Sequence, residues 1–115
     1  MRKGAYLWRR RVLREWKEFR KDRSYTYRMS VVYHFWSPTC GPCKTIKPAV
    51  EDMKEEFSDV SWVSVNTHDD PNGFARRFGV SVVPTMVVTK NDMEVGRHSG
   101  TNMIIYYTLI RKARA

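Results

Sequence analysis

The sequence predicts an α/β fold in which a central mixed sheet lies between helices. Short apolar strand patterns alternate with helical patterns along the chain, as in β–α units. Near the C-terminus, two strand patterns flank Lys90-Asn91-Asp92 and predict an antiparallel hairpin. The length of 115 residues, with 42% hydrophobic and 29% charged residues, matches one globular domain over residues 1–115.

The first predicted element is a basic amphipathic helix over residues 5–22. Its apolar residues recur at helical spacing, and its other face is mostly cationic; the stripe is Ala5, Trp8, Val12, Trp16 and Phe19. Residues 1–28 hold 11 Lys and Arg against 3 Asp and Glu, and thus +8 of the net charge of +9. We expect the stripe to pack on the sheet. Two interpretations of the charged face stay open: it is simply solvated, or it attracts an acidic protein, nucleic acid or anionic lipid.

A strand, a helix and a second strand follow. Met29–Trp36 is short and almost continuously apolar, as a buried central strand should be. The segment from Cys40–Gly41 to about Phe57 carries an apolar stripe at helical spacing, and Pro48 inside it is expected to kink the helix. Val60–Val65 repeats the buried-strand pattern.

The last third of the chain completes the predicted sheet and its cover. A short helix is predicted at Gly73–Phe78, after a turn. Thr85–Thr89 and Met93–His98 are the strands of the hairpin. Asn102 can cap a final helix from Met103 to about Lys112, and the basic residues at its end suit the negative end of the helix dipole.

Cys40 and Cys43 are the only cysteines, and they lie where the first strand leads into a helix. Unpaired N–H groups and the helix dipole favour a thiolate at such a position. A thiolate at Cys40 can attack a disulfide, and Cys43, one turn further on, can release the product. A redox pair is therefore favoured over inert cysteines and over a zinc site. Structural zinc needs four ligands, and the three histidines lack the H-x(3–5)-H spacing.

The residues around the cysteines resemble a known family. The stretch Phe35-Trp36-Ser37-Pro38-Thr39-Cys40-Gly41-Pro42-Cys43-Lys44 closely resembles the thioredoxin active-site motif F-W-A-x-W-C-G-P-C-K. From about Val31 onward the resemblance also includes Pro48, Asp70-Pro71, Gly79-Val80-x-x-Val83-Pro84-Thr85, Lys90-Asn91 and Gly100. It implies a thioredoxin fold and reduction of protein disulfides by dithiol exchange. It also implies no prosthetic group, and electrons supplied by a separate thioredoxin-reductase-type donor.

The resemblance implies roles for individual residues. Cys40 would attack the substrate disulfide and Cys43 would resolve the mixed disulfide. Pro84 would follow a cis peptide bond, although X–Pro bonds are cis only ~5–6% of the time in folded proteins. The backbone of Val83 would pair with an extended substrate segment. The surface that docks substrate would comprise Trp36, Gly41, Pro42, Val82, Val83, Pro84 and Gly100.

Three departures from the family pattern matter. His34 stands where thioredoxins carry a buried Asp, and Ser64 where they carry a Lys partner. A neutral His34 could accept the proton of Cys43, or it could be a hydrogen-bonded core histidine without a catalytic role. Thr39 replaces the tryptophan before the first cysteine, which should alter partner choice. The family's first strand has no counterpart ahead of Met29, so we expect a central mixed sheet of about four strands flanked by helices.

These observations favour a cytoplasmic, monomeric protein-disulfide reductase of the thioredoxin type. No apolar run approaches the ~18 residues that a membrane span needs. Basic residues interrupt the N-terminal segment, so a cleaved signal peptide is not expected. Two other interpretations stay open. One is a disulfide oxidant or isomerase, and the other is an accessory subunit that binds partners through the docking surface or the basic N-terminal helix.

Overall fold

The computed structural model describes residues 30–114, so the predictions for the basic segment 1–28 lie outside the described residues. Its elements are β1 (Ser30–Trp36), α2 (Gly41–Glu56), β2 (Ser61–Asn66), α3 (Phe74–Phe78), β3 (Thr85–Lys90), β4 (Met93–Ser99) and α4 (Met103–Arg114). Each corresponds to an element that the sequence predicts, with small shifts at the ends. The largest shift is in α4, which continues to Arg114 because Ala113 is buried against the core.

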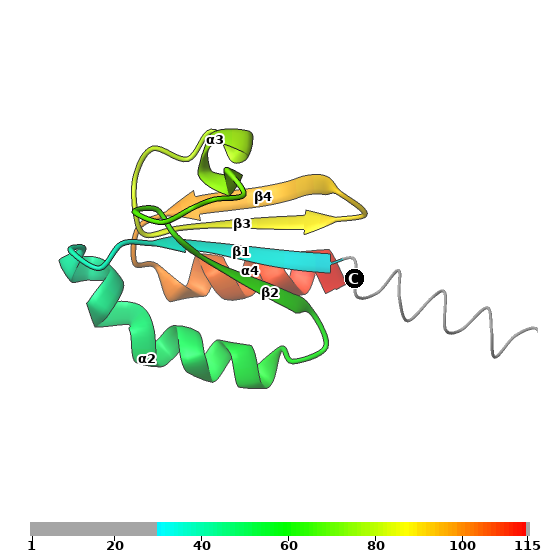
Figure 1. The fold of residues 1–115 in the computed structure, drawn as a ribbon. Helices are drawn as coiled ribbons and strands as arrows, with labels where there is room; N and C mark the ends of the chain where they lie inside the picture. The colour runs from blue at the N-terminus through cyan, green and yellow to red at the C-terminus, as the bar shows by residue number, and fades with distance from the viewer. Residues whose placement is uncertain (1–29, 115) are drawn as a thin grey trace, which may run out of the picture.

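The four described strands form one mixed sheet in the order β2-β1-β3-β4 (Figure 1). β1 pairs in parallel with β2 and antiparallel with β3, and β3 pairs antiparallel with β4. Helix α2 supplies the crossover between the parallel strands. The predicted mixed sheet of four strands is thus confirmed over residues 30–114. No helix in this range is long and apolar enough to cross a membrane.

The two faces of the sheet are covered by different helices. Figure 1 shows α2 and α4 on one side of the strands and α3 on the other. Val32 packs in one apolar cluster with residues of α2 and α4, whereas Tyr33 and Phe35 pack in a second cluster with residues of α3. Because side chains alternate along a strand, His34 shares the face of Val32 and points toward the α2 layer. This alternation decides which helix His34 meets.

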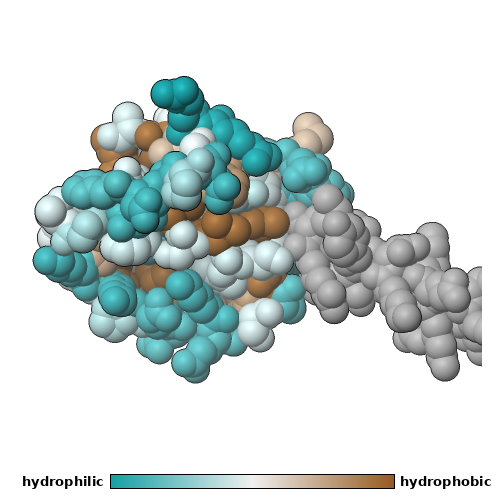
Figure 2. Space-filling view, in the orientation of Figure 1, coloured by the Kyte–Doolittle hydropathy of each residue, from teal (hydrophilic) through white to brown (hydrophobic). Residues whose placement is uncertain are grey.

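The outer surface is mostly hydrophilic. Figure 2 shows polar residues over most of one view, with apolar atoms in a band across its middle. Three large apolar side chains are strongly exposed in the described residues: Val82, Met93 and Ile104. Among them, Val82 lies in the segment that leads to Pro84, at the edge of the site described below.

Asp70 fixes the start of the short helix α3. Its carboxylate oxygens accept hydrogen bonds from the backbone N–H groups of Phe74 (3.1 Å) and Ala75 (2.9 Å). The ring of Phe74 then lies 5.3 Å from that of Tyr33, centroid to centroid, on the covered face of the sheet. The chain after α3 runs to Val83–Pro84, whose peptide bond is cis, as the resemblance implied. Asp70 therefore anchors the segment that delivers Pro84.

Replacing Asp70 by Ala should lower the free energy of unfolding by about 1–2 kcal/mol, because two helix N–H groups lose their acceptor. Urea unfolding of wild type and Asp70→Ala measures this difference. The matched control is Asp69→Ala, an exposed neighbour whose side chain caps no helix and which should change stability by less than about 0.5 kcal/mol. Equal effects of the two substitutions would contradict the assignment.

Candidate active site

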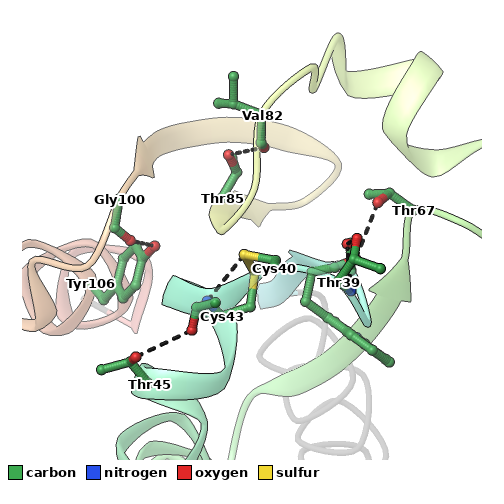
Figure 3. The surroundings of a disulfide bond; sticks show 12 residues. Thr39, Cys40, Cys43, Thr45, Thr67, Val82, Thr85, Gly100 and Tyr106 are labelled. Carbon is green, nitrogen blue, oxygen red and sulfur yellow. Dashed lines mark hydrogen bonds between the residues drawn. A yellow bond between two sulfur atoms is a disulfide. The ribbon is translucent and has the colours of Figure 1, made fainter.

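The two cysteines form a disulfide at the N-terminus of α2 (Figure 3). Cys40 is the N-cap residue, in an extended conformation, and Pro42 occupies the first turn, where the missing N–H is not needed. The backbone N–H of Cys43 donates to the Sγ of Cys40 at 3.1 Å. When the disulfide is reduced, this N–H and the positive end of the helix dipole can stabilise a thiolate at Cys40.

The two sulfur-bearing residues differ in exposure. Cys43 is 5% exposed, whereas Cys40 is partly exposed. Gly41 and Pro42 between them are exposed. A disulfide on another protein can therefore approach Cys40, and Cys43 is shielded behind it.

Two hydroxyl groups hold the loop before Cys40, and no sequence motif predicted this role for them. The backbone N–H of Thr39 donates to Ser37 Oγ at 3.2 Å, and the two hydroxyl oxygens are 3.0 Å apart. The N–H of Cys40 donates to the Ser37 carbonyl oxygen at 3.2 Å. Thr39 therefore supports the loop through Ser37, besides changing the surface where the family has a tryptophan.

Val82 and Gly100, two of the predicted docking residues, lie on the disulfide side of the segments drawn in Figure 3. The N–H of Gly100 donates to the carbonyl oxygen of Pro84 at 2.9 Å, and the Tyr106 hydroxyl donates to the carbonyl oxygen of Gly100. Burial raises the pKa of Tyr106 to about 12, so the hydroxyl keeps its proton and stays a donor. Thr85 Oγ1 donates to the carbonyl oxygen of Val82 at 2.7 Å. Tyr106 and Thr85 thus fix this surface. Thr85 belongs to the motif that carries the resemblance, but neither hydrogen bond was predicted from the sequence.

A cavity of about 380 Å³ lies behind the disulfide, between α2 and the β1–β2 part of the sheet. Its size is within the range of small-molecule sites. Its lining comes from β1, the loop after it, α2 and β2: His34, Trp36, Ser37, Pro38, Cys43, Lys44, Lys47, Val50, Glu51, Lys54 and Ser64. No group of three or more His, Cys, Asp or Glu side chains within residues 30–114 could hold a metal ion. His34 and Cys43 both line this cavity.

The surroundings of His34 keep it neutral. It pairs with Ser64 across β1–β2 and is 6% exposed, and its Nε2 has no hydrogen-bond partner among the described residues. Burial, and then the Lys54 ammonium, lower the pKa of His34 from 6.5 to about 4, while the Glu51 carboxylate opposes them. Both interpretations of His34, as an acceptor for the Cys43 proton and as a core histidine, stay open.

Ser64 also has a structural role that the sequence did not indicate. The indole Nε1 of Trp36 donates to Ser64 Oγ at 2.7 Å. This bond ties the partly exposed Trp36 to β2, on the side of the cavity. Trp36 thus lines the cavity behind Cys43, in addition to its predicted place on the docking surface.

Comparisons with known proteins agree with this geometry. A family model described as Thioredoxin matches residues 14–108. Thioredoxin from Mycoplasma genitalium is 36% identical over 79 residues, which cover 69% of this chain and 76% of that protein. Thioredoxin 1 from Synechococcus elongatus is 36% identical over 66 residues, covering 56% of this chain and 61% of that protein, less than two thirds of its length.

A solved structure is similar as well. The crystal structure of thioredoxin f from spinach chloroplast (long form) matches with a TM-score of 0.71 at 29% identity, over 78% of this chain and 74% of that chain. Both the sequence and the fold thus have counterparts in proteins named thioredoxin. This chain belongs to the thioredoxin family of thiol–disulfide oxidoreductases, with Cys40 and Cys43 as its redox pair.

Proposed function

We propose that this protein reduces disulfides of other proteins, with Cys40 as the attacking and Cys43 as the resolving residue. The supporting observation is the partly exposed Cys40 at the N-terminus of α2 with the buried Cys43 behind it. The Cys40 thiolate attacks a substrate S–S bond, forms a mixed disulfide and releases one substrate thiolate. The Cys43 thiolate then attacks Cys40 Sγ, releases the second substrate thiolate and closes the Cys40–Cys43 disulfide. Two electrons pass to the substrate, and its thiolates take protons from solvent.

The substrate would bind as an extended segment beside Val83 and the cis Pro84. Val82 is 55% exposed and Pro42 is exposed, so both offer apolar contact next to Cys40. Backbone pairing with Val83 would give affinity with little dependence on substrate sequence. The bonds that join Gly100 to Pro84 and Tyr106 hold this surface in place before substrate arrives.

The electrons would come from a separate reductase of the thioredoxin-reductase type, without a prosthetic group in this chain. The proposed location is the cytoplasm, where glutathione and thioredoxin systems keep thiols reduced. This proposed location rests on the sequence alone. Membership of the family does not set the compartment, because the family includes the chloroplast protein from spinach.

His34 would assist the second step. Its neutral ring lies in the same cavity as Cys43 and can accept a hydrogen bond from the thiol. A free thiol has a pKa of ~8.5, so it does not give up its proton fully to an imidazole whose pKa is about 4. The proposed role of His34 is therefore to orient the Cys43 thiol by accepting a hydrogen bond from it, while the proton itself passes to solvent.

Cys43→Ser should trap substrates as mixed disulfides on Cys40, because the resolving thiol is missing while the attacking one remains. Non-reducing electrophoresis and mass spectrometry of captured proteins detect them. The Cys40→Ser/Cys43→Ser double variant is the control and should trap none. If the single variant captures no disulfide-linked protein, the reductase proposal is wrong.

His34→Ala should slow resolution of the mixed disulfide roughly three- to tenfold, less than the loss of an efficient general base, and leave the attack by Cys40 unchanged. Stopped-flow kinetics with a fluorescent disulfide peptide separates the two steps. His68→Ala, which changes an exposed histidine away from the cavity, is the control. A loss spread equally over both steps would assign His34 a purely structural role.

Buried neutral His34 should make the oxidised protein sensitive to acid. Because its folded pKa of about 4 lies below the unfolded value of 6.5, its contribution to stability is present above pH 6.5 and is lost as the pH falls toward 4. Between pH 7.5 and 4.5, wild type should lose about 2–3 kcal/mol more than His34→Gln. Urea unfolding at the two pH values measures this, and parallel losses would contradict it.

A further inference from the structure

The resolving step depends on ionisation of Cys43, and the charges around its cavity come from one helix. This inference rests on the proposed function. The titratable groups that line the cavity with Cys43 are His34 of β1 and four residues of α2, and β2 contributes only the uncharged Ser64; the α2 groups are Lys44, Lys47, Glu51 and Lys54. Three ammonium groups thus face one carboxylate and a neutral imidazole, and the cavity is electropositive.

Glu51 and Lys54 form an ion pair within this lining. Lys54 Nζ lies 3.2 Å from Glu51 Oε2. The side chain of Lys54 is 29% exposed and that of Glu51 is 54% exposed, so solvent screens the cation less than the anion. Residues 43, 47, 51 and 54 follow the spacing of one helix face, and side chains on a helix lean toward its N-terminus. Both charged residues therefore lie on the same face of α2 as Cys43, and this face lines the cavity.

His34 shows that the field of this pair reaches the interior of the cavity. Lys54 lowers the pKa of His34 and Glu51 raises it. A positive potential that disfavours an imidazolium favours a thiolate, because the two groups ionise with opposite sign. We expect the same charges to act on the sulfur of Cys43, because it shares the cavity with His34.

We propose that the Glu51–Lys54 pair tunes the resolving step: Lys54 favours the Cys43 thiolate that attacks Cys40, and Glu51 weakens that effect. Neither residue touches the reacting sulfurs, so both are positioning residues that act through the potential in the cavity. Cys43 then ionises without a buried carboxylate beside it, and its proton leaves through the cavity to solvent.

An ordinary helix-surface ion pair is the alternative, since i,i+3 pairs stabilise a helix by only ~0.2–0.5 kcal/mol. The charge-swapped variant Glu51→Lys/Lys54→Glu separates the two explanations. It keeps an ion pair at the same spacing but places the anion at position 54. If the pair only stabilises the helix, the swapped variant should behave like wild type. If the pair acts through the potential in the cavity, the swapped variant should differ from wild type.

The first test titrates the His34 imidazole by NMR in the oxidised full chain. Lys54→Gln and the charge-swapped variant should raise the pKa of His34, and Glu51→Gln should lower it further. Lys112→Gln, on the exposed side of α4, is the control and should leave it unchanged. A His34 pKa that is the same in all variants would overturn the inference.

The second test follows both steps of a single turnover against pH with the reduced full chain and a disulfide peptide. Lys54→Gln should slow resolution about threefold at pH 7 and move its pH profile to the alkaline side. Loss of the cation leaves less Cys43 thiolate, and the higher nucleophilicity of the remaining thiolate offsets part of that loss. Glu51→Gln should accelerate resolution. The charge-swapped variant should slow resolution more than Lys54→Gln does. Attack by Cys40 should change less than twofold.

The outcomes distinguish the inference from the proposed function. One result is that wild type attacks the peptide normally while the rate of resolution is the same in all variants, and another is that the swap restores the wild-type pH profile. Either result refutes the role of the pair and leaves the reductase function standing. If wild type forms no mixed disulfide at all, the reductase function itself fails.

Discussion

The site depends on the pairing of β1 with a strand on each side. Its parallel register with β2 places His34 beside Ser64, and its antiparallel register with β3 places His34 beside Met86. A slip of one residue would turn every side chain of β1 to the opposite face. His34 would then leave the α2 side, and Trp36 would lose Ser64 as the acceptor of its indole N–H. The apolar clusters on both faces hold this register, because each takes residues from β1.

This register also determines where the charges lie in the cavity behind the redox pair. The sheet presents a neutral imidazole and a hydroxyl to the cavity, whereas every charged side chain in the lining comes from α2. Burial keeps His34 neutral, so at neutral pH the cavity contains no charge from the sheet. Helix α2 is therefore proposed to act on both cysteines. Its N-terminus stabilises a thiolate at Cys40, and charged side chains further along the helix act on Cys43.

Local patterns identified the reacting residues but not what holds them. The C-x-x-C spacing before a helix marked Cys40 and Cys43, and the family resemblance marked Pro84 and Gly100. The hydroxyl of Tyr106 on the Gly100 carbonyl, and the pair of Ser37 and Thr39 before Cys40, follow no pattern of spacing. Such contacts depend on how a loop meets a helix, which periodicity does not encode. The basic segment 1–28 lies outside the described residues, so its predicted partner stays a prediction.

By itself, the sequence determined the order of helices and strands, the hairpin and the redox pair, because apolar periodicity, turn residues and cysteine spacing are properties of neighbouring residues. The tertiary structure alone decided which distant side chains meet. Trp36 and Ser64 are 28 positions apart, and the register of two parallel strands brings them within 2.7 Å. The same packing buried His34 opposite Lys54 and shifted its pKa, because burial and charge act through space and not along the chain.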